Sequence, residues 1–114
     1  MVIEKFEDII SWQKSRDLAI YVYQVFKDNR DFSFRDQIRS AVVSMSNNIA
    51  EGFERKGNKE FRKFLYIAKG SCAEVRSMAY IALELGYITK DQFEHIYRAT
   101  VEISKLISGL IKTL

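Results

Sequence analysis

The sequence predicts an all-α fold, an antiparallel up-down-up-down bundle of four helices, and three observations support this prediction. The 114 residues contain no Pro, which is the strongest helix breaker. Only five residues are Gly, whereas all-β folds usually place many Gly and Pro in their turns. Apolar residues repeat at helical spacing in four segments that short polar joints separate. A chain of this length fits one domain, which we expect to span residues 1–114.

The four predicted helices cover most of the chain. The first runs from about Ser11, its expected N-cap, to residue 29, and the second covers about residues 34–55. The sequence Lys-Gly-Asn at 56–58 predicts a helix stop at Gly followed by an Asn cap. The third helix is expected over 59–85 with Gly86 after its end, and the fourth begins after Thr89 and continues to the C-terminus. Because the joints are short, each helix must run antiparallel to the next.

The third predicted helix carries two apolar rows at heptad spacing. The first seam consists of Phe61, Leu65, Ala68, Cys72, Val75, Ala79 and Ala82. The second seam consists of Phe64, Ile67, Ser71, Glu74, Met78, Ile81 and Leu85. A helix with two such stripes either lies centrally or faces a second subunit, so we expect a homo-oligomer. The alternative is that the second seam is simply part of the core of a monomer.

The joint between the second and third helices carries a cluster of basic residues. Residues 55–69 contain six positively charged residues and one negatively charged residue, Glu60. The net charge of this stretch is therefore +5, compared with +3 for the whole chain. Such a cluster is a candidate phosphate-binding site for RNA or DNA. An ordinary solvated face is the alternative interpretation, and no RNA-recognition motif with interleaved aromatic residues is present. The candidate nucleic-acid-binding residues, which we call the basic cluster, are Arg55, Lys56, Lys59, Arg62, Lys63 and Lys69.

A second candidate site is a set of polar residues on the second and third helices. Its members are Arg39, Ser44, Asn48, Glu51, Ser71 and Glu74. We interpret the set as a structural polar network that fixes helix register, with Arg39 as the counter-ion. A pair of carboxylates for acid–base or metal chemistry is the alternative. The chain has one His and one Cys, and Gln92 stands where a Glu-x-x-His motif needs Glu, so we expect no metal, no cofactor and no enzymatic activity.

Two glycines lie inside predicted helices. Gly in a helix interior costs about 1 kcal/mol relative to Ala, so something must compensate at Gly52 and Gly70. We expect close approach between helices at both positions.

Three blocks of sequence resemble a known family. They are FEDIISWQKSRDLA at 6–19, QIRSAVVSMSNNIAEG at 37–52 and FRKFLYIAKGSCAEV at 61–75, followed by LELGYI at 83–88. In this order they resemble the bacterial four-helix bundle proteins of the 23S rRNA intervening-sequence family. The chain departs from the family pattern at Ser46, where a Pro is usual, so a kink there is expected to be weaker or missing. It also has Ser40 where a second basic residue is common.

The resemblance implies a pentameric ring of four-helix bundles. It also implies a relation to the accessory protein of diversity-generating retroelements, a basic pentamer that binds a reverse transcriptase and nucleic acid. We therefore expect a non-catalytic oligomer that binds RNA, DNA or a nucleic-acid-processing protein. A structural adaptor with a protein partner and no nucleic-acid role is the alternative. No predicted membrane span or secretory signal is present, so we expect a cytoplasmic location.

Overall fold

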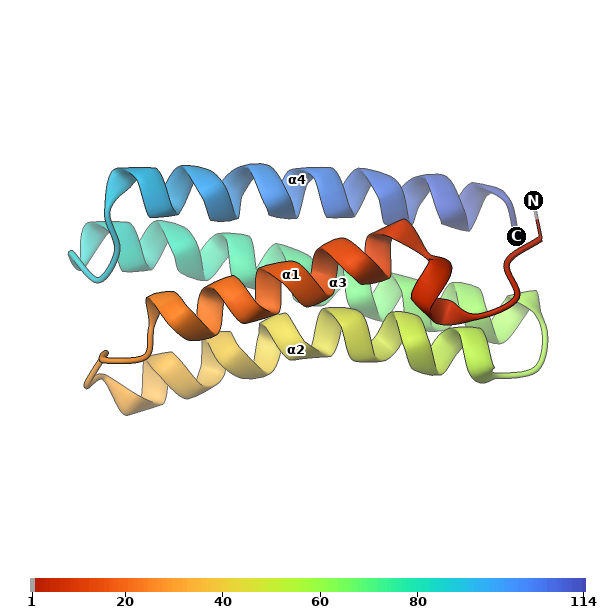
Figure 1. Ribbon diagram of the computed structural model, residues 1–114, viewed down its shortest axis with the longest axis horizontal. Coiled ribbons are helices and arrows are strands. Elements are labelled where there is room, and N and C mark those ends of the chain that lie inside the picture. The colour runs from red at the N-terminus through yellow and green to blue at the C-terminus, as the bar shows by residue number, and fades with distance from the viewer. Residues whose placement is uncertain (1) are drawn as a thin grey trace.

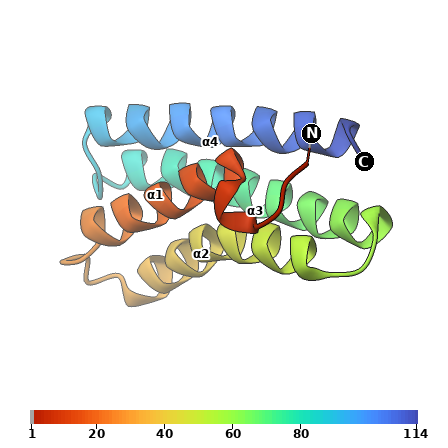
Figure 2. The ribbon, with the colours of Figure 1, turned by 45° about the vertical axis from the view of Figure 1, so that its right-hand side comes forward.

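The computed structural model describes residues 2–114, and this part of the chain is all-helical. A short 3-10 helix, η1 (Phe6–Asp8), precedes four long helices. They are α1 (Ile10–Val25), α2 (Phe32–Glu54), α3 (Asn58–Glu84) and α4 (Lys90–Lys112). The loops that join them lie at alternate ends of an elongated molecule (Figure 1). Each helix packs beside its sequence neighbours, α1 also packs beside α4, and α1 and α3 lie diagonally across the core without a close approach of their backbones. The turned view in Figure 2 shows the same arrangement.

The start of α1 differs from the prediction. The helix begins at Ile10, and its N-cap is Ile9, which provides no side-chain cap. Ser11 therefore lies inside the helix, where its hydroxyl is buried and has no hydrogen-bond partner within residues 2–114. The helix ends at Val25, four residues earlier than predicted, and α2 begins two residues earlier. Asp31 is the N-cap of α2 and accepts a hydrogen bond from the backbone N–H of Phe34 at 3.2 Å.

The ends of α3 and the start of α4 are set by glycines and by a capping side chain. Gly57, at φ 86°, precedes α3 and is its N-cap, so the predicted Asn58 cap is wrong and Asn58 is the first helical residue. Gly86, at φ 74°, follows α3 as expected, because this backbone conformation favours Gly. Thr89 caps α4 through a capping box in which its side chain and that of Gln92 satisfy each other's backbone N–H groups.

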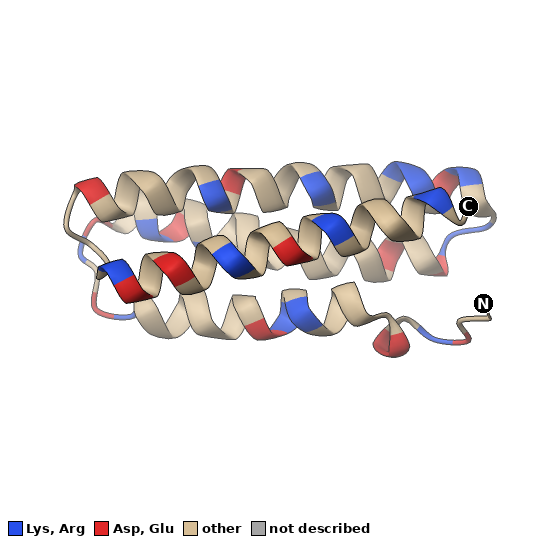
Figure 3. Cartoon of the chain, turned by 90° about the horizontal axis from the view of Figure 1, so that it is seen from above, with Lys and Arg blue, Asp and Glu red and all other residues tan. Residues whose placement is uncertain are grey.

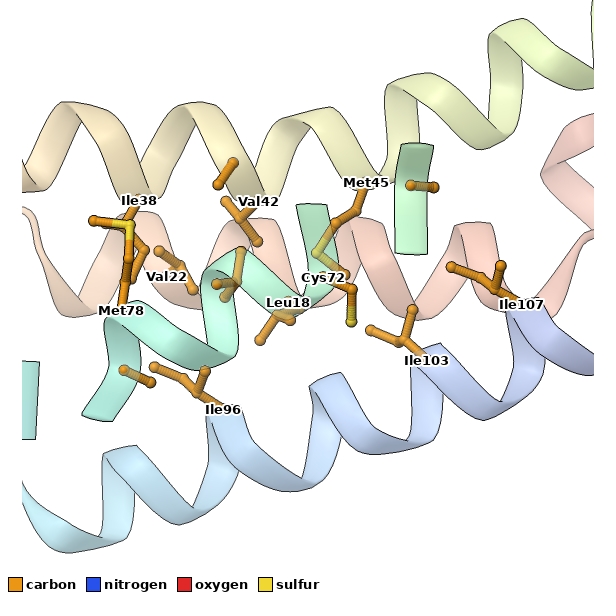
Figure 4. Close-up of a cluster of buried hydrophobic side chains, with 14 of the residues drawn as sticks. Leu18, Val22, Ile38, Val42, Met45, Cys72, Met78, Ile96, Ile103 and Ile107 are labelled. Carbon is orange, nitrogen blue, oxygen red and sulfur yellow. The ribbon is translucent and has the colours of Figure 1, made fainter. Parts of the chain in front are cut away.

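The core lies along the bundle axis and receives side chains from all four helices. The first seam of α3 is buried at every position. Its Cys72 packs among Leu18 of α1, Met45 of α2 and Ile103 of α4 (Figure 4). The Cys72 Sγ donates to the backbone oxygen of Thr100 at 3.1 Å. Burial raises the pKa of this thiol to about 11, so Cys72 is a structural residue and not a reactive nucleophile.

The second seam of α3 lies at the surface beside α2. Of its members only Met78 is buried, whereas the exposed fractions of Ile67, Ile81 and Leu85 are 45%, 48% and 55%. The second seam is therefore not core in the isolated chain. Such a row of large apolar side chains along one helix is unusual for a surface that faces only water.

The two helical glycines occupy different environments. A Cβ at Gly52 would lie 2.5 Å from Cβ of Phe64, so α2 approaches α3 closely at this point, as expected. A Cβ at Gly70 would meet no atom within 4 Å, so the expected close approach at Gly70 is wrong. Gly70 lies on an exposed side of α3. The helix α2 continues without interruption through Ser46, where the resemblance indicated that a kink would be weaker or missing.

Within residues 2–114, no helix has an apolar stretch long enough to cross a membrane.

Candidate nucleic-acid interface

The basic cluster lies at the end of the molecule where α2 leads into α3. The C-terminus of the chain reaches the same end (Figure 3), and Lys112, the last residue of α4, adds a further positive charge. Five members of the basic cluster lie in the loop or in the first two turns of α3. Lys69 lies two turns further along α3, so the structure separates it from the others.

Two arginines of the basic cluster are engaged within the chain. Arg55 donates from Nη2 to Glu51 Oε2 at 2.8 Å, and its guanidinium lies 5.1 Å from the centre of the Phe64 ring. The hydrogen bond to Glu51 raises the pKa of Arg55. Arg62 is half-buried and donates from Nη2 to the terminal backbone oxygen of Leu114 at 2.5 Å. These two side chains therefore position local structure and have less freedom to meet an external anion.

The lysines of the basic cluster have no such partners. Lys56, Lys59 and Lys63 are exposed, and none forms an ion pair with any residue of 2–114. Their ammonium groups can reach an external phosphate without breaking an internal contact, and α3 holds Lys59 and Lys63 one turn apart. These three lysines are the best-placed anion ligands at this end.

The predicted polar network forms only in part. Ser44 Oγ and Ser71 Oγ are 2.9 Å apart, and Asn48 Nδ2 donates to Ser44 Oγ at 2.9 Å. Asn48 also donates to the backbone oxygen of Ser44 at 2.8 Å. All three side chains are half-buried at the contact between α2 and α3. The network is small and uncharged, and it joins the two helices that pack most extensively.

The three charged residues assigned to that network lie elsewhere. Arg39 faces α1, where its Nη2 donates to the backbone oxygen of Tyr23 at 3.1 Å and its guanidinium covers the Tyr23 ring. Glu51 pairs with Arg55, and Glu74 is exposed and accepts from Gln37 at 3.4 Å. No pair of carboxylates meets in the network. Within residues 2–114 there is also no group of three His, Cys, Asp or Glu side chains arranged to hold a metal ion.

The structure also exposes residues that the sequence interpretation did not single out. Tyr66, Tyr80 and Tyr97 have exposed fractions of 56%, 52% and 37%. Arg76 lies seven residues after Lys69 and fourteen after Arg62. This regular spacing was available in the sequence and would have added Arg76 to the basic residues of α3.

The fold and this surface define an all-helical four-helix bundle protein with one strongly basic end. The chain belongs to the family of 23S rRNA-intervening sequence proteins, whose family model matches residues 7–109. It is also similar to a solved crystal structure, at 1.70 Å resolution, of a protein of unknown function from the S23 ribosomal protein family of Bacteroides thetaiotaomicron VPI-5482. That similarity has 26% sequence identity and a TM-score of 0.84, and it covers 90% of this chain and 99% of the other. No curated protein matches the chain.

Proposed function

We propose that this chain is an antiparallel, non-catalytic bundle whose copies assemble into a ring and bind RNA or DNA through the basic end. The observation that carries the proposal is the trio of exposed lysines without internal partners, Lys56, Lys59 and Lys63. Each lysine that neutralises a phosphate releases condensed counterions, which favours binding at low salt. The alternating positions of the loops support the antiparallel topology.

Support for assembly comes from the second seam of α3. Ile67, Ile81 and Leu85 leave about half of their surface in water in the isolated chain. Covering them with a second copy removes this apolar surface from solvent, which is the main favourable term in association. The family resemblance favours five copies. A ring repeats the basic end once per subunit, so weak phosphate contacts add up on one strand.

Binding is tested by titrating a structured RNA and a single-stranded DNA at about 50 mM salt and again at about 200 mM. We expect binding that weakens steeply as salt rises. The Lys59→Gln/Lys63→Gln variant should bind several-fold more weakly and show a shallower salt dependence. Lys27→Gln/Lys90→Gln is the matched control, because these lysines are also exposed but lie at the opposite end of the bundle. Absence of binding at the lower salt would overturn the nucleic-acid role.

Assembly is tested by sedimentation of the unmodified chain. We expect five times the 13.3 kDa mass of one chain. A mass of 13.3 kDa at micromolar concentration would overturn the ring. A stable ring without affinity for RNA or DNA, together with salt-insensitive capture of a protein, would favour the structural adaptor.

A further inference from the structure

One row of basic residues on α3 faces α4. Arg62, Lys69 and Arg76 are spaced by seven residues, which places them on one side of a helix. Arg62 contacts Leu114, which directly follows the end of α4. Arg76 lies one helical turn after Cys72, and the Cys72 thiol bonds to the backbone of Thr100 in α4. The row therefore runs along the side where α3 and α4 pack together.

A row of tyrosines accompanies these cations. Tyr66 and Tyr80 lie two heptads apart on α3, which is about 21 Å at 1.5 Å per residue. The Tyr80 ring centre is 4.9 Å from that of Phe93 and 6.4 Å from that of Tyr97, both of α4. Tyr66 and Tyr80 each leave more than half of their surface exposed. We call Tyr66, Lys69, Arg76, Tyr80 and Tyr97 the tyrosine face.

Between Tyr66 and Tyr80, the exposed side of α3 carries residues with small or no side chains. Gly70 and Ala73 lie between them and are exposed, and apart from the adjacent residues and backbone of α3 nothing lies within 4 Å of the position that a Gly70 Cβ would occupy. Small side chains therefore lie on α3 between two tyrosines that are each more than half exposed, so planar groups can reach Tyr66 and Tyr80 from solvent. This arrangement also offers a reason for Gly70 within the helix, where close packing does not require a Gly.

The charges of the tyrosine face favour an anionic partner over a second copy of the chain. Lys69 and Arg76 form no ion pair within residues 2–114, and Lys63 and Lys59 continue the positive charge toward the basic end. The second seam on the other side of α3 is different, because it carries aliphatic side chains and the acidic Glu74. A strand of nucleic acid supplies both phosphates for the cations and bases for the rings.

We infer that the tyrosine face binds single-stranded nucleic acid, with bases stacked on Tyr66 and Tyr80 and phosphates beside Lys69 and Arg76. The inference rests on the nucleic-acid binding proposed above and adds the strand type and the contacts. A duplex hides its base faces inside the stack, so only an unpaired strand can use the rings. Tyr97 closes the α4 side of the face and supports the Tyr80 ring.

Fluorescence anisotropy tests the inference with three labelled ligands of about 15 nucleotides, within the range of known single-strand sites. They are a single-stranded DNA, the duplex of the same sequence, and an abasic strand that keeps the phosphates and lacks the bases. We expect the single strand to bind the unmodified chain about tenfold more tightly than either of the others. The Tyr66→Leu/Tyr80→Leu variant should lose this preference, whereas Tyr66→Phe/Tyr80→Phe should keep it, because the ring and not the hydroxyl stacks.

Tyr23→Leu is the matched control, since Tyr23 is also exposed but lies on α1, across the diagonal from α3. Equal affinity for the abasic and base-bearing strands would overturn the inference while leaving phosphate binding at the lysines intact. Absence of binding to all three ligands at low salt would overturn the proposed function and the inference together. A fall in oligomer mass for Tyr66→Leu, without any change in strand preference, would identify the tyrosine face as a contact between copies and overturn the inference.

Discussion

The two seams of α3 have the same heptad spacing but different environments. Leu65 in the first seam is fully buried, whereas Ile81 in the second seam is 48% exposed. Both rows have heptad spacing, so periodicity alone predicts that each packs against something. The other helices of the chain cover only one row completely. The comparison teaches that a helical repeat identifies surfaces that can pack, while the number of helices available decides which surfaces stay uncovered.

The largest effect is expected for a truncation in the first seam. Leu65→Ala removes a fully buried side chain and leaves a cavity between helices, which costs about 2–5 kcal/mol in free energy of unfolding. Urea unfolding followed by circular dichroism measures this loss as a lower midpoint. An unchanged midpoint would mean that the first seam is not the tightly packed side of α3.

The next largest effects on stability are expected from substitutions at the two helical glycines. Gly52→Ala forces a methyl group against Cβ of Phe64 and should destabilise the chain by about 1–3 kcal/mol. Gly70→Ala meets no atom and should stabilise it by about 0.5–1 kcal/mol, because Ala restricts the unfolded chain and favours helix. Thermal unfolding of the two variants side by side should show shifts of opposite sign. Shifts of the same sign would contradict the difference in packing.

A smaller effect is expected where the loop after α3 meets the start of α2. Tyr87 Oη donates to Asp31 Oδ2 at 2.6 Å, and this bond lowers the pKa of Asp31 and raises the pKa of Tyr87. Because the folded pKa of Asp31 is depressed, its stabilisation is present above the ordinary aspartate pKa and is lost as pH falls through the depressed value. The Tyr87 contribution is present below the ordinary tyrosine pKa and is lost as pH rises through the raised value.

Tyr87→Phe should therefore lower the melting temperature slightly at neutral pH, and the difference from the unmodified chain should shrink at both pH extremes. Melting curves from acid to alkaline pH measure this. A difference that stays constant at acid pH would show that the contact does not involve the Asp31 carboxylate.

The smallest effect on the fold is expected in the second seam. Ile81→Ala should change the free energy of unfolding of the isolated chain by no more than about 0.5 kcal/mol, because the side chain is half-exposed. Denaturation at a concentration too low for assembly measures this. The same variant should weaken assembly in sedimentation at higher concentration. A loss of stability comparable to that of Leu65→Ala would remove the distinction between the seams.

The sequence predicted the fold more fully than the site, and particular residues show why. Thr89, Gly86 and the first seam depend on local chemistry and regular spacing, and all three are where we expected them. The Ser11 cap failed because the buried Ile9 takes the N-cap position and the helix starts at Ile10, which places Ser11 inside the first turn.

The candidate site depends on contacts between distant residues, which spacing does not reveal. The partner of Arg62 is Leu114, 52 residues away, and that of Arg39 is Tyr23 on another helix. The sequence interpretation assigned Arg62 to an external phosphate and Arg39 to the polar network, and the structure gives both arginines other partners. Only the three-dimensional arrangement separates them from the unpaired lysines, and only it shows that the space beside Gly70 is open.

The burial of Cys72 has a practical consequence. It is the only Cys of the chain, its side chain is inaccessible, and burial raises the pKa of its thiol to about 11, which makes the reactive thiolate scarcer than at an exposed Cys. An alkylating reagent can modify it only while the centre of the bundle is transiently open. The rate of alkylation in the native state therefore reports the free energy of that opening. The natural sequence thus already contains a chemical probe of its own dynamics, and no label has to be introduced.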